Sequence, residues 1–264
     1  MEPLAITRSL TVPGPFWTFN REERNAVSIL VSLLGQASNL ETFVRALGWA
    51  PPDLADAEVS VEWTFLRDLW SHHSQRQTPH TLRLAILDCL QPLDRARLEA
   101  CSIHEFNTHF GAVPQPSTTY VQSPGNWSIG RFDRNIPEND QFRQTCRFKW
   151  AFNIKPDLVI QTPSGHVLCI EAKWDSMEGK YPASEPEKVI FKRRGLPYLT
   201  QTEVQRYLVN EALGLQGTFA YLARSHFETD AGRSVTWAEI IPQLDRSDAP
   251  KFVQAWCEQE AGRS

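Results

Sequence analysis

Three polar residues are predicted to gather on one face of a β-hairpin in the stretch KPDLVIQTPSGHVLCIEAKWD (155–175). Two apolar runs flank a Pro-Ser-Gly turn centred at Ser164, and alternation of this kind is typical of paired strands. The antiparallel register then places Asp157 opposite Glu171, at a Cβ separation of about 5 Å. Lys173 follows Glu171 by two residues and shares its face. We therefore expect two carboxylates and an ammonium group near the open end of the hairpin.

Such a cluster favours metal-assisted chemistry. Two neighbouring carboxylates repel each other, and burial makes the conflict worse. A divalent cation resolves it, because Mg²⁺ binds through one or two carboxylates together with waters and substrate phosphate. A lysine beside the metal can orient a water or stabilise charge in the transition state. The opposite face is apolar and is expected to pack on the core, with Leu158, Ile160, Leu168, Ile170 and Ala172.

The motif Pro156-Asp157 with Glu171-Ala172-Lys173 resembles the signature of the PD-(D/E)xK nuclease superfamily, which has the restriction-endonuclease-like fold. The resemblance covers roughly residues 146–224. It implies that Asp157 and Glu171 bind Mg²⁺, for which Mn²⁺ can substitute, that Ala172 assists through its backbone carbonyl, and that Lys173 positions the attacking water. It also implies a mixed β-sheet core flanked by helices.

Members of this superfamily often carry a further metal-binding Glu on an upstream helix. Glu23 continues an apolar row with Val27, Leu30 and Leu34, so it is expected to face inward. A capping-box role at the start of the same helix, with Asn20 as the cap, is an equal alternative. Glu22 and Glu105 are other candidates for this position.

Two polar segments could bind substrate near the metal. Gln201 and Gln205 are four residues apart and share a helix face, so either could contact a water at the metal or a phosphate. The Gln-x-x-x-Tyr spacing of RecB-like members is not met, and a solvated polar face is the alternative. A basic cluster precedes this helix and is predicted to contact phosphates, with a solvated surface as the alternative; it comprises Lys188, Lys192, Arg193 and Arg194.

The pattern along the chain predicts an α+β or α/β fold with an all-helical N-terminal part. The predicted organisation is an arm at 1–18, a helical region at 19–112, a loop or linker at 113–140 and a nuclease-like domain at 141–264. In the last of these, strands are predicted at 146–154, 157–161, 167–174 and 217–224, a helix at 197–214, and two terminal helices at 236–245 and 248–260.

Composition excludes several other classes of protein. The formal charge of −4 and the pI near 6.0 give no global indication that the protein binds a polyanion such as nucleic acid. Five cysteines, an odd number without a CxxC pair, predict neither a disulfide framework nor a zinc ribbon. No apolar run is long enough to span a bilayer and no signal peptide is evident, so a cytoplasmic protein without membrane contact is expected. His104 and His109 are five apart, which fails the zincin spacing.

The leading hypothesis is a Mg²⁺-dependent nuclease, and the resemblance favours DNA over RNA as substrate. Restriction, repair and phage defence are all compatible with it. The helical N-terminal part would shape substrate access, or mediate a homo-oligomer or a protein partner. One alternative is a catalytically inactive nuclease-like module for nucleic-acid binding or assembly. A second alternative is a helical adaptor whose hairpin is incidental.

Overall fold

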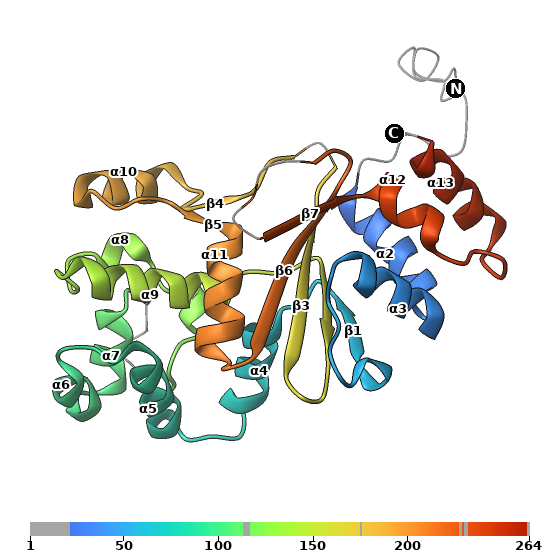
Figure 1. Ribbon diagram of the computed structural model, residues 1–264. Helices are drawn as coiled ribbons and strands as arrows, with labels where there is room; N and C mark the ends of the chain where they lie inside the picture. Colours follow the sequence, from blue (N-terminus) through green and yellow to red (C-terminus); the bar gives the residue numbers. More distant parts are fainter. Residues whose placement is uncertain (1–21, 113–116, 175, 227–228, 230–231, 263–264) are drawn as a thin grey trace, which may run out of the picture.

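A five-stranded mixed β-sheet forms the centre of the computed structural model, with helices on both faces (Figure 1). The structure describes residues 22–112, 117–174, 176–226, 229 and 232–262, so the arm predicted at 1–18 and the cap predicted at Asn20 lie outside it. The order is β1-β2-β3-β6-β7, antiparallel from β1 to β3 and parallel from β3 to β7. The strands are β1 Glu58–Val61, β2 Leu158–Gln161, β3 His166–Ala172, β6 Gln216–Ala223 and β7 Gly232–Thr236.

The predicted hairpin register is confirmed. Leu158 pairs with Ile170 and Val159 pairs with Cys169 across β2 and β3. Gly165 closes the turn with φ of 83°, a left-handed conformation that glycine adopts without steric cost. Because β3 is the middle strand of five, both faces of the hairpin are covered for most of its length.

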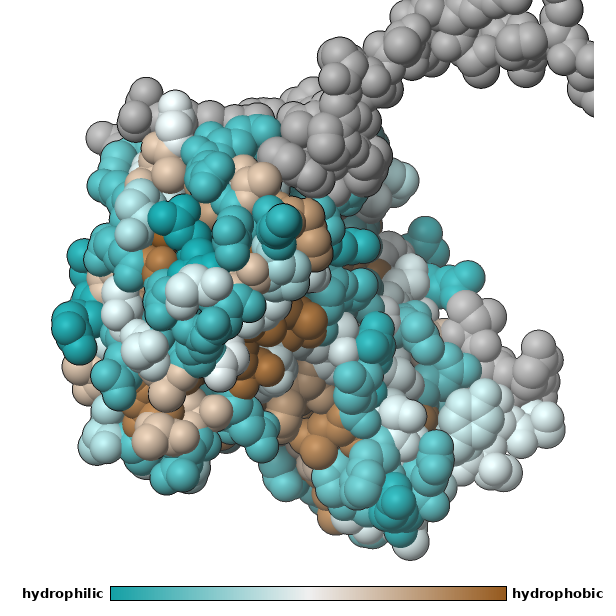
Figure 2. Space-filling model, turned by 90° about the vertical axis from the view of Figure 1, so that its right-hand side faces the viewer, coloured by the Kyte–Doolittle hydropathy of each residue, from teal (hydrophilic) through white to brown (hydrophobic). Residues whose placement is uncertain are grey.

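Two hydrophobic layers sandwich the sheet. The predicted apolar face of the hairpin packs under one layer, which Figure 2 views from outside. Apolar surface there gathers in a hollow between hydrophilic rims. This layer comprises α2 Glu23–Leu34, α3 Ala37–Ala46, α12 Trp237–Ile240 and α13 Lys251–Ala261. The other layer includes α4 Phe65–Ser74, α5 Pro79–Leu90, α9 Asn139–Ala151 and α11 Gln201–Arg206, which continues as a π-helix over Tyr207–Ala212.

Smaller elements complete the described chain. None of its helices combines the length and apolar character that crossing a bilayer requires. The short strands β4 Lys180–Tyr181 and β5 Leu199–Thr200 form a second sheet. The remaining helices are α6 Arg95–Ala100, α7 Ile103–His109, α8 Ile129–Phe132 and α10 Glu185–Arg194, with 3₁₀ turns at Leu54–Asp56, Pro124–Asn126 and Ile241–Gln243.

Two sequence predictions were wrong in the type of element. The region 19–112 is not all-helical, because β1 forms within it and pairs with β2. The segment 146–154, predicted as a strand, lies mostly in α9. Its aromatic residues favour a strand locally, but Phe142, Cys146 and Trp150 recur every four residues and bury one helical face. The predicted linker at 113–140 contains α8 and a 3₁₀ turn, and β7 and α10 were not predicted.

Candidate active site

The predicted polar cluster lies where the carboxyl end of β3 is next to the start of β2. Asp157 lies one residue before β2, and its Oδ2 accepts the backbone N–H of Ala172 at 2.9 Å. Glu171 is 4% exposed and Lys173 is 7% exposed. The backbone N–H of Lys173 donates to the Leu222 carbonyl on β6 at 2.9 Å, which fixes this strand end against its neighbour. The three predicted residues therefore converge at one end of the sheet.

Glu171 is the centre of the hydrogen-bond network. Its Oε1 accepts from Lys173 Nζ at 2.7 Å, and its Oε2 accepts from Gln205 Nε2 at 2.9 Å. Gln205 is 2% exposed on α11, so this helix packs an amide directly onto the strand carboxylate. Gln201 begins the same helix, and its backbone N–H donates to the Gly179 carbonyl at 2.8 Å. Of the two predicted glutamines, only Gln205 contacts the cluster.

Glu23 also reaches the end of β3. Its Oε1 accepts the backbone N–H of Trp174 at 2.8 Å and the hydroxyl of Ser176 at 2.7 Å. The carboxylate at the start of α2 is thus bound to the strand end, beside Lys173. Glu105, another candidate for the upstream metal-binding glutamate, forms a capping box with Ser102 at the start of α7. Its carboxylate is therefore engaged within its own helix.

The electrostatics of the cluster follow from burial of like charges. Burial, and then the negative charge of Glu171, raise the pKa of Asp157 to about 8. Burial alone would lower the pKa of Lys173, but the Glu171 carboxylate outweighs it, and the net pKa is raised. Asp157 and Glu23 add smaller contributions in the same direction. Lys173 is therefore a cation at neutral pH, and Asp157 retains its proton there.

The backbone of Ala172 is oriented towards Asp157. Lys173 donates its N–H to β6, and successive residues of a strand address opposite neighbours. Ala172 accordingly directs its N–H to the β2 side, where Asp157 accepts it. Because the N–H and C=O of one strand residue address the same neighbour, the Ala172 carbonyl is expected on this side as well.

The donor set fits a magnesium ion that retains most of its waters. Among the residues that the structure describes, no group of three or more His, Cys, Asp or Glu side chains is arranged to hold a metal. Mg²⁺ does not need such a cage, because one or two carboxylates suffice when waters fill the other positions. Burial, and then the charge of Glu171, raise the pKa of Asp157, and a divalent cation bound between the two carboxylates would relieve both effects.

The metal-free protein should lose stability as pH rises from about 4 to about 8. Over this window, between the ordinary value of 3.8 and the raised pKa of about 8, folded Asp157 holds a proton that the unfolded chain has released. Asp157→Asn has no such proton to lose, so its free energy of unfolding should depend less on pH. Urea unfolding in EDTA across this range measures the slope. An equal slope in wild type and variant would contradict the assignment.

The predicted basic cluster does not act as one unit. Arg194 is bound inside the protein: its Nε donates to Asp133 Oδ1 at 2.7 Å, and its guanidinium lies 3.9 Å from the centre of the Phe142 ring. It also donates to backbone carbonyls, including that of Ile136 at 2.7 Å. Arg194 ties α10 to the segment after α8, so its prediction as a phosphate ligand was wrong. Arg193 pairs with Asp133 but is largely exposed.

Arg194→Ala should lower the free energy of unfolding by about 3 kcal/mol, because it leaves the buried Asp133 carboxylate without its main partner. Arg193→Ala is the matched control and should cost less than about 1 kcal/mol, since that side chain is 62% exposed. Urea unfolding of both variants measures the difference. Equal effects would refute the structural role of Arg194.

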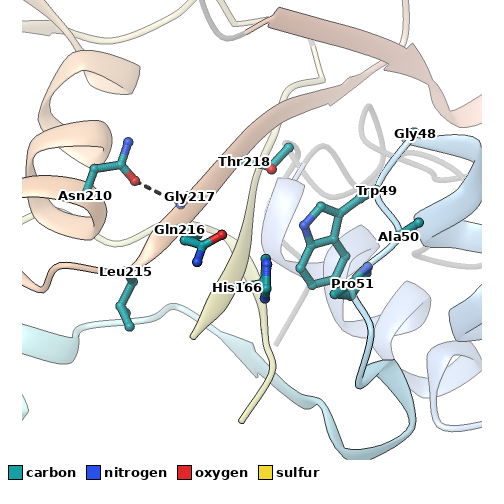
Figure 3. Close-up of a pocket in the computed structure, with 10 residues that line it drawn as sticks. All are labelled: Gly48, Trp49, Ala50, Pro51, His166, Asn210, Leu215, Gln216, Gly217 and Thr218. Atoms are coloured by element: carbon teal, nitrogen blue, oxygen red, sulfur yellow. Dashed lines mark hydrogen bonds between the residues drawn. The ribbon is translucent and has the colours of Figure 1, made fainter. Parts of the chain in front are cut away.

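A separate cavity of about 360 Å³ lies at the other end of the sheet (Figure 3). His166 and Gln216 begin β3 and β6 there, and Trp49 lies across from them. Glu171 lies near the opposite end of β3, so this cavity does not include the carboxylates.

Comparisons with models of protein families, with curated proteins and with solved structures find no match for this chain. The site must therefore be interpreted from its own geometry.

Proposed function

We propose that this protein is a Mg²⁺-dependent nuclease that hydrolyses phosphodiester bonds, most readily those of DNA. The observation that carries the proposal is the convergence of Asp157, Glu171 and Lys173 at one end of the central sheet. Mn²⁺ is expected to substitute for Mg²⁺. The five unpaired cysteines are compatible with a reducing compartment such as the cytoplasm.

The architecture supports a restriction-endonuclease-like fold. A mixed sheet is flanked by helices, and the motif residues lie where β2 begins and β3 ends. The helix α2 contributes Glu23 to the same strand end, as the resemblance implies for an upstream glutamate. Glu23 is accordingly proposed to complete the ligand set, directly or through a water.

Each site residue is proposed to have a distinct role in metal binding or in hydrolysis. Bound Mg²⁺ would act as a Lewis acid for the scissile phosphate. Asp157 and Glu171 would hold it, and Asp157 must give up its proton to do so. The Lys173 ammonium, fixed by Glu171 at 2.7 Å, can position the attacking water and stabilise negative charge on the phosphate. Gln205 holds the second oxygen of Glu171 and so orients that carboxylate.

Incubation of the purified protein with linear, circular and single-stranded DNA and with RNA tests the proposal. Cleavage is expected with Mg²⁺ or Mn²⁺ and is expected to stop in EDTA. Binding of nucleic acid without cleavage under every metal condition would instead favour an inactive nuclease-like module. Absence of both cleavage and binding would refute the proposed function.

A further inference from the structure

Glu62 has a backbone conformation that glutamate rarely adopts. It directly follows β1, and its φ is 51°, in the left-handed region. Its N–H donates to the Asp157 carbonyl at 3.1 Å, and the N–H of Trp63 donates to the Pro156 carbonyl at 3.1 Å. Glu62 is therefore the cross-strand neighbour of Asp157. Unusual backbone of this kind tends to occur where a side chain must be re-aimed near a functional site.

The left-handed turn separates two carboxylates. In a regular antiparallel pair, Glu62 and Asp157 would present their side chains on the same face, where Glu171 already lies. Instead the Glu62 carboxylate contacts two cations. Its Oε1 lies 2.9 Å from Arg24 Nε, and its Oε2 lies 3.3 Å from Lys155 Nζ.

Both cations are adjacent in sequence to site residues. Arg24 directly follows Glu23 on α2, and Lys155 lies two residues before Asp157. Their side chains are 69% and 42% exposed, so solvent reaches both of them. Glu62 thus holds a pair of accessible cations that are near neighbours in sequence of Glu23 and Asp157.

We propose that Arg24 and Lys155 bind the sugar-phosphate backbone of the substrate, and that Glu62 occupies them until a phosphate replaces it. The inference rests on the proposed nuclease function and names a substrate-binding surface for it. Guanidinium and ammonium groups are the usual phosphate partners, and Arg can donate two parallel hydrogen bonds.

The charge of the site makes such cations necessary. Glu171 and Glu23 set two carboxylates against the single cation Lys173, and this surplus of negative charge repels a polyanion when metal is absent. Arg194 cannot offset it, because Asp133 and backbone carbonyls bind that side chain. Arg24 and Lys155 provide positive charge on the β1 side of the cluster instead.

A groove of about 380 Å³ continues from Glu62 along the start of α4. Trp63 and Phe65 line it, with ring centres 4.8 Å apart. Trp63 is buried in the core, so the partly buried Phe65 ring is the aromatic surface on which a base can stack. The acidic Asp68 in the groove is paired with Arg67 at 3.0 Å, so its charge is partly offset. The groove gives nucleotides next to the bound phosphate a place to lie.

Fluorescence anisotropy with labelled DNA tests the inference, with Ca²⁺ in place of Mg²⁺ to suppress cleavage. Arg24→Ala and Lys155→Ala should each weaken binding about 10-fold and lower the salt dependence by about one phosphate contact. Glu62→Gln removes the competing charge but keeps the side-chain size, so it should tighten binding about 3-fold. The exposed Lys251 on α13 provides the control Lys251→Ala, which should bind as wild type does.

The outcomes separate this inference from the proposed function. If wild type binds and cleaves DNA but Arg24→Ala and Lys155→Ala keep its affinity and salt dependence, the inference alone is overturned. Weaker binding by folded Glu62→Gln would overturn the competing role of that carboxylate. If wild type neither binds nor cleaves nucleic acid, the function fails and the inference fails with it. Urea unfolding of each variant confirms that affinity is compared between folded proteins.

Discussion

Replacement of Lys173 by methionine should reduce the rate of metal-dependent DNA cleavage by about 10²- to 10⁴-fold. The side chain keeps an unbranched stem as long as that of lysine to Cε but loses the ammonium that contacts Glu171 at 2.7 Å. Without that group, the attacking water loses its positioning donor, and charge on the phosphate loses a cation. Asp157 and Glu171 remain, so divalent metal should still bind. Single-turnover cleavage at saturating Mg²⁺ measures the rate, and calorimetry measures the metal.

The control for this variant must separate chemistry from folding. Loss of Lys173 leaves the buried Glu171 carboxylate with Gln205 as its remaining partner, and breaking a buried pair costs about 3–5 kcal/mol. The folded fraction is therefore determined by circular dichroism before rates are compared. Lys180→Met is the matched substitution, at an exposed lysine on β4. If folded Lys173→Met cleaves at the wild-type rate, Lys173 has no catalytic role.

Asp157→Asn should abolish both metal binding and cleavage, which distinguishes it from the lysine variant. An amide cannot neutralise a divalent cation, and in the proposed site Asp157 is one of the two principal carboxylate ligands. The same change removes the ionisable group whose pKa is raised to about 8 by burial and then by the charge of Glu171. In EDTA above pH 8 the variant should therefore be at least as stable as wild type. Cleavage assays, calorimetry and urea unfolding on one preparation measure the three properties.

Glu171→Gln provides the comparison at the other proposed metal ligand. It should also lose metal binding, but it leaves the Lys173 ammonium 7% exposed without its carboxylate partner. Its stability should fall by about 3 kcal/mol, in contrast to Asp157→Asn. Retention of full cleavage activity by either variant would refute the assignment of these carboxylates as metal ligands.

The hairpin register was predictable because it depends on local information. A short turn fixes which residues face each other, and apolar alternation fixes which face is buried. The strand β1 was not predictable in the same way. Its four residues follow a 3₁₀ turn and precede α4, so a short period-two pattern is lost among helical ones. It forms because β2 offers a free edge, almost a hundred residues later in the chain.

Whether the remaining predicted site residues reach the site depends on side-chain contacts between residues far apart in the sequence. Gln201 and Gln205 share a helix pattern, but only the packing of α11 selects Gln205 for Glu171. Arg194 looks like a surface cation in the sequence, and only tertiary structure brings it to Asp133. The left-handed conformation of Glu62 had no sequence signal, because glycine or asparagine is the usual sign of it.

Titration of Mn²⁺ into the metal-free protein by calorimetry is the most direct test of the central claim that Asp157 and Glu171 hold a divalent cation. The account predicts saturable binding by wild type at pH 8 and weaker binding at pH 6, because Asp157 must first lose its proton. Binding should persist in Lys173→Met and disappear in Asp157→Asn and Glu171→Gln. No binding by wild type, or equal binding by all four folded proteins, would contradict the account.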